Sequence, residues 1–238
     1  MDQSHTEARK TGRLFPGIVQ SLVPVLKSKY FYIGLLALLA GAALNIASQT
    51  YLHNYMSEGK TLPMLSDLIL DNLPVIDLSF IYDIFCIVIF IIVTIYIIDK
   101  EDYNRLPYIL FLCGIFFIVR GIFIVLTPFG NPPNFNGSDL IFNGFSKYEL
   151  GVYPSGHVGN SFLLLLLVND RMYRYILGVC LVIIILSLFL AHGHYSIDIL
   201  SGLFFAYAIR SFGDKYFKVF MLPDKKMHDP TVQFLKNN

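Results

Sequence analysis

Two histidines and an aspartate at the ends of apolar segments carry the groups in this sequence best suited to chemistry. His194 and Asp198 are four residues apart, the spacing that places two side chains on one face of a helix. The carboxylate can then hold one imidazole nitrogen and orient the other outward, as in a histidine nucleophile or base. His157 follows Ser155 and Gly156 at an expected helix start, where free backbone N–H groups and the helix dipole favour an anion such as phosphate.

The elements that must position these residues are transmembrane helices. The chain has 238 residues, of which 55% are hydrophobic, and several apolar runs are long enough to cross about 30 Å of hydrocarbon. We predict an all-α integral membrane protein, a bundle of six transmembrane helices. The predicted spans are Phe31 to Tyr51, Phe80 to Ile98, Leu106 to Thr127, His157 to Val168, Tyr175 to Ala191 and Tyr195 to Phe212. The apolar segment Leu14 to Leu26 is broken by two prolines and a glycine, which predicts an interfacial position.

The positive charges predict the orientation of the bundle. Of the 18 lysines and arginines, only Lys60 and Lys147 fall in the loops opposite the termini, and Arg120 lies inside the third span. Because basic residues concentrate on the cytoplasmic side, both termini are expected there. The chain then divides into a cytoplasmic segment, a six-helix membrane domain and a cytoplasmic tail: residues 1–30, 31–212 and 213–238.

With this topology, the candidate residues share the non-cytoplasmic side of the membrane. An ionisable residue at membrane depth is costly, so each requires a partner, a water-filled cavity or a function. Each one alone has a structural interpretation: a single interfacial histidine is more often structural, and Ser155 can be a plain helix cap. Two histidines, a carboxylate and a helix start on one face together favour a functional site.

Two segments resemble the second and third motifs of the type 2 phosphatidic acid phosphatase superfamily of lipid phosphatases and phosphotransferases. They are Tyr153-Pro-Ser-Gly-His157 and Ala191-His-Gly-His-Tyr-Ser-Ile-Asp198. Within the superfamily the chain looks most like the sphingomyelin synthase group, which carries Ala-His-x-His-Tyr-x-x-Asp and a Pro-x-x-Asp element similar to Pro74-Val-Ile-Asp77. The resemblance covers roughly residues 73–212 and implies six spans with both termini cytoplasmic.

Two arginines of the phosphatase pattern are missing from this chain. The pattern ends span three with a basic residue, six others and Arg-Pro, whereas here Thr127 stands seven residues after Arg120. In the third motif Leu188 replaces the other arginine. A phosphomonoester is nearly dianionic and is well bound by bidentate guanidinium groups, whereas a phosphodiester has one charge and needs fewer. The missing arginines therefore favour a phosphodiester, such as an intact phospholipid.

The resemblance and the missing arginines together imply a mechanism. His194 attacks the phosphorus of a phospholipid head group, Asp198 stabilises the imidazolium, and a phosphohistidine forms. His157 protonates the departing diacylglycerol oxygen and then deprotonates an acceptor hydroxyl, of ceramide if the family analogy holds or of another diacylglycerol. Water as the acceptor would make the same site a phospholipase C.

Further residues are candidates for binding substrate. They are Ser155, Gly156, Arg120, Tyr148, Glu149, Tyr195 and His192. Arg120 is two helical turns from Thr127 and either reaches the phosphate or pairs with Asp77 or Asp83. Tyr148 and Glu149 stand where sphingomyelin synthases have Cys-Gly-Asp, and could hold a quaternary ammonium by cation–π and charge contacts.

Several alternatives stay open at this point. The scheme requires no cofactor or metal, although His192, His194 and Asp198 can also be interpreted as metal ligands beside His157. The same site could instead hydrolyse phosphatidic acid or an isoprenyl diphosphate, and the bundle could be a non-enzymatic lipid transporter or scaffold. A net charge of +1 gives no reason to expect a nucleic-acid partner. The sequence is compatible with a monomer or with a homo-oligomer.

Overall fold

The computed structural model describes residues 18–135 and 153–223, and within these ranges the chain is helical and contains no strand. The long helices are α2 (Lys29–Ser57), α3 (Ser79–Asp99), α4 (Leu106–Leu126), α5 (Gly156–Leu167), α6 (Arg171–Leu190) and α7 (Ser196–Tyr216). The short 3₁₀ turns are η1 (Leu70–Asn72), η2 (Tyr103–Arg105) and η3 (Lys218–Phe220). The all-α prediction is confirmed, and each predicted span coincides with one long helix.

Four helices in the described part of the chain are long and apolar enough to cross a membrane: α2, α3, α6 and the segment Tyr103–Leu126 that contains α4. These helices indicate a membrane protein. With only 12 residues, α5 covers about 18 Å, well below the hydrocarbon thickness. The 21 residues of α7 include Asp198, Arg210, Asp214 and Lys215. Spans at α5 and α7 therefore stay a prediction.

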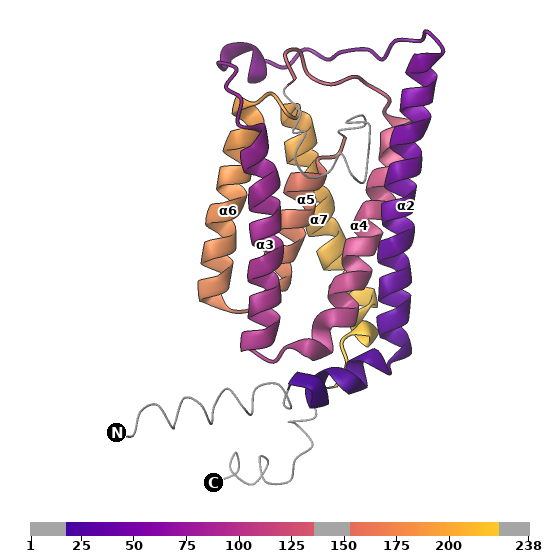
Figure 1. Ribbon diagram of the computed structural model, residues 1–238, viewed down its shortest axis with the longest axis vertical. Coiled ribbons are helices and arrows are strands. Elements are labelled where there is room, and N and C mark those ends of the chain that lie inside the picture. The colour runs from indigo at the N-terminus through magenta and orange to yellow at the C-terminus, as the bar shows by residue number, and fades with distance from the viewer. Residues whose placement is uncertain (1–17, 136–152, 224–238) are drawn as a thin grey trace.

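The helices run along one common axis, with α3 beside α6, α5 beside α7, and α2 against α4 (Figure 1). Helical residues 18–26 lie across the end of the bundle that carries η2 and η3 (Figure 1). Residues 18–26 are the described part of the segment Leu14 to Leu26, whose interfacial placement stays a prediction. The α6–α7 connection lies at the opposite end.

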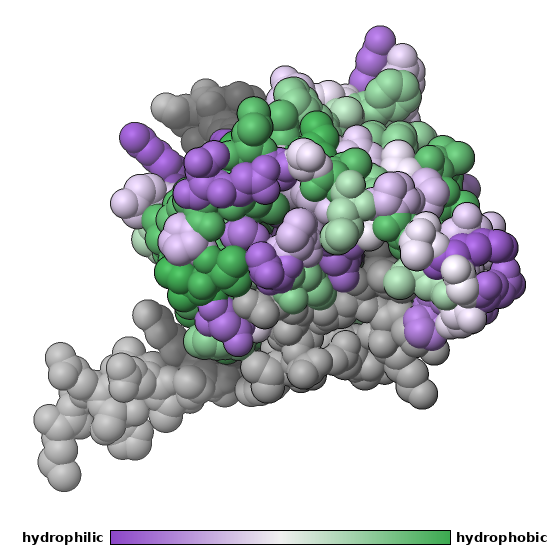
Figure 2. Space-filling view, turned by 90° about the horizontal axis from the view of Figure 1, so that it is seen from above, coloured by the Kyte–Doolittle hydropathy of each residue, from purple (hydrophilic) through white to green (hydrophobic). Residues whose placement is uncertain are grey.

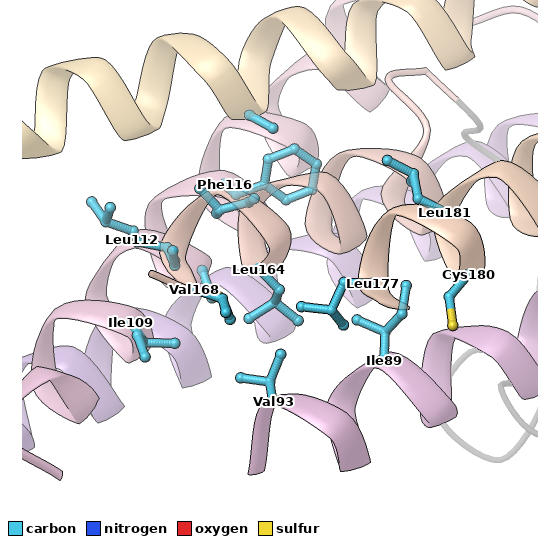
Figure 3. Close-up of a cluster of buried hydrophobic side chains, with 14 of the residues drawn as sticks. Ile89, Val93, Ile109, Leu112, Phe116, Leu164, Val168, Leu177, Cys180 and Leu181 are labelled. Atoms are coloured by element: carbon cyan, nitrogen blue, oxygen red, sulfur yellow. The ribbon is translucent and has the colours of Figure 1, made fainter. Parts of the chain in front are cut away.

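Apolar side chains fill the centre of the bundle and also cover its outside. Figure 3 shows part of the buried cluster, in which residues of α3, α4 and α6 converge on Leu164 of α5. Outward-facing residues such as Leu36, Phe90 and Phe204 are about two-thirds exposed, at 67%, 66% and 67%. Such a surface suits lipid, because acyl chains are as apolar as leucine side chains.

A close contact between α5 and α7 fixes the end of the bundle that carries the polar residues. A Cβ atom at Gly202 of α7 would lie only 2.9 Å from the Ser155 carbonyl oxygen. A Cβ atom at Gly159 of α5 would lie 3.1 Å from the Gly202 carbonyl oxygen and would also overlap the ring of Phe116, on α4, at 2.2 Å. Small residues are needed at both positions because they let the two backbones approach. The start of α5 is thereby held against the first turns of α7.

Candidate active site

Four ionisable side chains meet near the end of the bundle that carries the α6–α7 connection. The Nδ1 atom of His157 lies 3.4 Å from Nε2 of His194, and Nε2 of His157 lies 3.1 Å from Oδ1 of Asp83. The Nδ1 atom of His194 lies 3.4 Å from Oδ2 of Asp198. Two imidazole rings thus stand between two carboxylates, one on α3 and one on α7.

The start of α5 places His157 as the sequence predicts. Ser155 is the N-cap of the helix, and its hydroxyl accepts a hydrogen bond from the backbone N–H of Val158 at 3.3 Å. The backbone N–H of Ser155 donates to the carbonyl oxygen of Asp198 at 3.0 Å. Ser155 is fully buried, so its hydroxyl serves the helix cap while its backbone N–H ties α5 to α7.

One geometric prediction is wrong, namely that His194 and Asp198 share a face of one helix. The helix α7 begins at Ser196, so His194 lies in the connection before it. Asp198 is the third residue of the helix, and its Oδ2 accepts the backbone N–H of Tyr195 at 2.9 Å. This bond turns the carboxylate back toward His194, as the third residue does in a capping box. The four-residue spacing therefore brings His194 and Asp198 together through the capping box at the start of α7.

Burial separates the roles of the two histidines. The side chains of His194 and Asp198 are 4% and 0% exposed and that of Asp83 is 3% exposed, whereas His157 is 27% exposed. Burial lowers the pKa of His194 below its ordinary value although Asp198 acts in the opposite direction. His194 is therefore neutral near pH 7, as a nitrogen nucleophile must be.

The contacts also restrict where protons reside. A carboxylate only accepts hydrogen bonds, so Nε2 of His157 carries a proton directed at Asp83. A hydrogen bond between the two rings needs one proton between them, and the arrangement that suits catalysis puts it on Nδ1 of His157. His194 then keeps a proton on Nδ1 and a free lone pair on Nε2. The Nδ1···Oδ2 contact with Asp198 is not yet aligned as a hydrogen bond, and such bonds often tighten with substrate.

Sequence reasoning missed the role of Asp83, which it considered only as a partner for Arg120. The available signal was a carboxylate one turn inside an apolar span, where a charge without a partner is costly. Asp77, the acid of the Pro-x-x-Asp element, is exposed, and its carboxylate accepts the backbone N–H of Ser79 at 3.2 Å and the Ser79 hydroxyl at 2.7 Å. The similarity at Asp77 therefore does not contribute a residue to the cluster.

Arg120 lies against the start of α5. Its Nε donates to the carbonyl oxygen of Pro154 at 3.0 Å, and a Cβ atom at Gly156 would lie 2.9 Å from Nε. Its Nη1 donates to Oδ1 of Asn45, on α2, at 2.6 Å. The guanidinium is thus beside the helix that carries His157.

Asn45 is a second residue that sequence reasoning missed. It is 7% exposed in the middle of α2, and its Nδ2 donates to the carbonyl oxygens of Gly41 at 2.8 Å and Phe117 at 2.5 Å. These two bonds orient the amide so that Oδ1 faces Arg120. A lone asparagine in the first apolar span was the available signal.

The remaining predicted site residues surround the cluster or lie elsewhere. Tyr195 is 1% exposed, and its hydroxyl accepts from the backbone N–H of Leu65 and donates to the carbonyl oxygen of Asn131. His192 is also buried, at 5% exposed, in the α6–α7 connection. Tyr148 and Glu149 lie outside the described residues.

Asp67 joins the α2–α3 loop to the first turn of α7. Its carboxylate accepts the backbone N–H of Ser196 at 2.6 Å and the Ser196 hydroxyl at 2.5 Å. Burial acts to raise the pKa of Asp67, but the hydrogen bonds from Ser196, Leu70 and Ile69 outweigh it and hold the pKa below its ordinary value. Asp67 is thus an anion at neutral pH that supports the helix carrying Asp198.

In the described ranges, no group of three or more histidine, cysteine, aspartate or glutamate side chains is arranged to hold a metal ion. Comparison with known proteins identifies no family for the chain, since no protein-family model and no curated sequence matches it. The geometry of the His–His–carboxylate cluster is therefore the basis for inferring a function.

Proposed function

We propose that the protein is a membrane phosphotransferase that moves the phosphorylated head group of a phospholipid to a lipid hydroxyl through a phosphohistidine. The observation that carries the proposal is the 3.4 Å contact between Nδ1 of His157 and Nε2 of His194. Each ring has its own carboxylate on the far side, so a nucleophile and a proton donor are aimed at one point.

In the first half-reaction, the Nε2 lone pair of His194 attacks the phosphorus and the bond to the diacylglycerol oxygen breaks. That oxygen takes the Nδ1 proton of His157, which leaves a neutral imidazole facing Asp83. The phosphorylated His194 ring carries a positive charge, and Asp198 stabilises it at close range. The products are diacylglycerol and a phosphohistidine that holds the head group.

In the second half-reaction, an acceptor hydroxyl gives its proton to Nδ1 of His157 while its oxygen attacks the phosphorus. The P–N bond breaks, and its electron pair returns to Nε2 of His194. Both histidines thereby recover their starting protonation. Ceramide or diacylglycerol supplies the hydroxyl in this proposal, and the resemblance to sphingomyelin synthases favours ceramide.

The charge around the cluster supports a phosphodiester donor. Arg120 is the cation beside the start of α5, and a single guanidinium suits the single charge of a diester. The described part of the α2–α3 loop carries four carboxylates against Lys60: Glu58, Asp67, Asp71 and Asp77. This negative potential opposes a dianionic phosphomonoester.

The proposal also includes the topology. Six spans, with both termini cytoplasmic and the cluster on the non-cytoplasmic side, would follow from the distribution of basic residues. The short helix α5 would leave His157 recessed toward the depth of lipid head groups. A diester phosphate of a lipid in the outer leaflet would then reach the two rings.

The test is a transfer assay on detergent-purified protein. Labelled phosphatidylcholine and phosphatidylethanolamine are supplied as donors with and without ceramide or diacylglycerol, and phosphatidic acid is tested beside them. We expect diacylglycerol release that rises with acceptor, matched by phosphorylated acceptor and absent from His194→Ala. Phosphate release from phosphatidic acid alone would reassign the chain as a phosphatase. Intact cellular function of His157→Ala and His194→Ala would favour a non-enzymatic role.

Removing the Asn45 amide should weaken catalysis through Arg120. In Asn45→Leu, the guanidinium loses one of the acceptors that fix its position, and one hydrogen bond to a charged group is typically worth about 1.5–3 kcal/mol. We expect kcat/KM for the diester donor to fall about tenfold to a hundredfold. The measurement is steady-state transfer kinetics, with thermal unfolding of each variant recorded in parallel.

Ser48→Ala is the matched control for Asn45→Leu. Ser48 is one helical turn further along α2 and donates to the carbonyl oxygen of Gly121 at 2.8 Å, so it also joins α2 to α4. Because its hydroxyl donates to Gly121, kcat/KM of Ser48→Ala should stay within about twofold of the starting protein. Equal losses in the two variants would mean that Asn45 serves only helix packing.

A further inference from the structure

A small pocket opens beside the α6–α7 connection, on the end of the bundle that carries the cluster. Its volume is about 250 Å³, and it is lined by Leu65, Asp67, Leu70, Asp71, Leu73, Val75, Pro133, Asn134 and His192. Figure 2 looks onto this end of the bundle, where hydrophilic side chains interrupt an otherwise apolar surface. The pocket is large enough for a small polar group but not for a lipid chain.

His192, which lines this pocket, carries an unused hydrogen-bond acceptor. Its Nδ1 lies 3.3 Å from the carbonyl oxygen of Pro133, and because a carbonyl only accepts, Nδ1 carries the proton. In the neutral ring Nε2 is then a bare lone pair. That atom is buried and has no hydrogen-bond partner among the described residues. A buried acceptor without a donor is costly, so a ligand that supplies a donor would be favoured.

The charge of the pocket specifies what kind of donor fits. Asp67 stays ionised because its hydrogen bonds with Ser196 and the loop hold its pKa low, and Asp71 adds an exposed carboxylate at the rim. The described lining contains no lysine or arginine to offset them. The aliphatic walls of Leu65, Leu70 and Val75 suit a short carbon chain. A small cation that carries N–H groups matches all three properties.

The pocket is also close to the nucleophile. His192 and His194 are two residues apart, so their α-carbons are separated by at most about 7 Å. His192 has a positive φ of 50°, a conformation that is uncommon outside glycine, and Asn134 across the pocket has 59°. Backbone held in this region often marks a ligand site.

We propose that this pocket binds a primary ammonium group, with Asp71 and Nε2 of His192 accepting its N–H bonds. The inference rests on the proposed function, because it assigns the ammonium to the head group of the donor phospholipid when the phosphate lies at His194. A primary ammonium has three donors, whereas a trimethylammonium has none and would leave His192 unsatisfied. The site therefore selects an ethanolamine-type head group over a choline-type one.

The direct test measures cation binding without any reaction. Ethanolamine and choline are titrated against the purified full-length protein at pH 7 and followed by ligand-observed NMR. We expect ethanolamine to bind with a Kd on the order of millimolar, as a ligand of so few atoms allows, and choline at least about tenfold more weakly. Equal binding of the two cations, or binding of neither, would overturn the inference.

Two substitutions test the assigned acceptors. His192→Asn keeps a residue that tolerates positive φ and should weaken ethanolamine binding about tenfold or more. Asp71→Asn removes a charge at the partly open rim and should weaken binding about twofold to fivefold. Glu58→Gln removes the same charge from the same loop outside the pocket lining and should leave binding unchanged. If Glu58→Gln weakens binding as much as Asp71→Asn, the pocket is not the site.

The transfer assay distinguishes a lipid head group from a free amine. If the head group is the ligand, phosphatidylethanolamine should exceed phosphatidylcholine in kcat/KM by about tenfold, and His192→Asn should remove the preference. If ethanolamine binds selectively but no phospholipid is turned over, the ammonium site stands and the proposed function fails. If both lipids react equally and His192→Asn changes nothing, the proposed function stands and the ammonium site fails.

Discussion

His194→Ala should abolish head-group transfer, with a loss of at least about 10⁴-fold in kcat, because it removes the atom that forms the covalent bond to phosphorus. His157→Ala should lose a similar amount with a natural phospholipid, since the departing diacylglycerol oxygen is then not protonated. An activated phosphodiester distinguishes the two variants, because its nitrophenolate leaving group needs no proton from His157. His157→Ala should then release one equivalent of nitrophenolate and stop.

The stalled species identifies the nucleophile. In His157→Ala the acceptor hydroxyl has no base, so an acid-labile phosphohistidine should accumulate and be located at His194 by peptide mass spectrometry. His53→Ala, which changes a histidine on α2, serves as the control and should retain full turnover. A burst in His194→Ala, or a phosphate on any other residue, would contradict the assignment.

The helices could be predicted from the sequence because they depend on properties local to the chain. Long apolar runs separated by charged or proline-containing segments fixed the positions of all six long helices. The end of α2 at Ser57, beyond the predicted end at Tyr51, reflects continued helix in a polar stretch where hydropathy carries no signal. Whether α5 and α7 cross the membrane depends on helix length and on charge. The helix α5 has only 12 residues, and α7 carries four charged side chains.

The candidate site could be predicted only in part, because it depends on which helices are neighbours. His157, His194 and Asp198 stand at helix starts, and local motifs mark them. Asp83 reaches His157 because α3 packs beside α5 and α6, and Asn45 reaches Arg120 because α2 packs against α4. A single sequence contains no record of these pairings. Apolar side chains facing lipid and apolar side chains facing another helix give the same hydropathy pattern.

The same limit explains why the resemblance marks Asp77 whereas the cluster contains Asp83. Asp77 precedes α3 in a Pro-x-x-Asp element that carries part of the resemblance, yet it is exposed and bonds only to the neighbouring Ser79 in the described structure. Asp83 is one turn further in, on the face of α3 that turns toward His157. Local similarity therefore marks the start of this helix but not the carboxylate that contacts His157.

Asp83→Asn should therefore lower kcat for the natural phospholipid by about 10² to 10⁴-fold while KM changes little. Asparagine keeps the size of the side chain and can still accept from Nε2 of His157, but it has no charge to stabilise the imidazolium. Removing an orienting carboxylate behind a catalytic histidine costs about 10⁴-fold in the serine protease triad. The measurement is transfer kinetics with thermal unfolding as the check on folding.

The activated diester then decides whether Asp83 acts through the proton or through the fold. Its leaving group needs no proton, so the nitrophenolate burst in Asp83→Asn should stay within about fivefold of the starting protein even though lipid transfer is lost. Asp77→Asn removes the neighbouring exposed carboxylate, keeps an oxygen that can accept from Ser79, and should leave both reactions intact. Equal losses with both donors in Asp83→Asn would make Asp83 a structural residue. A loss confined to the natural lipid would identify His157, held by Asp83, as the acid of the first half-reaction.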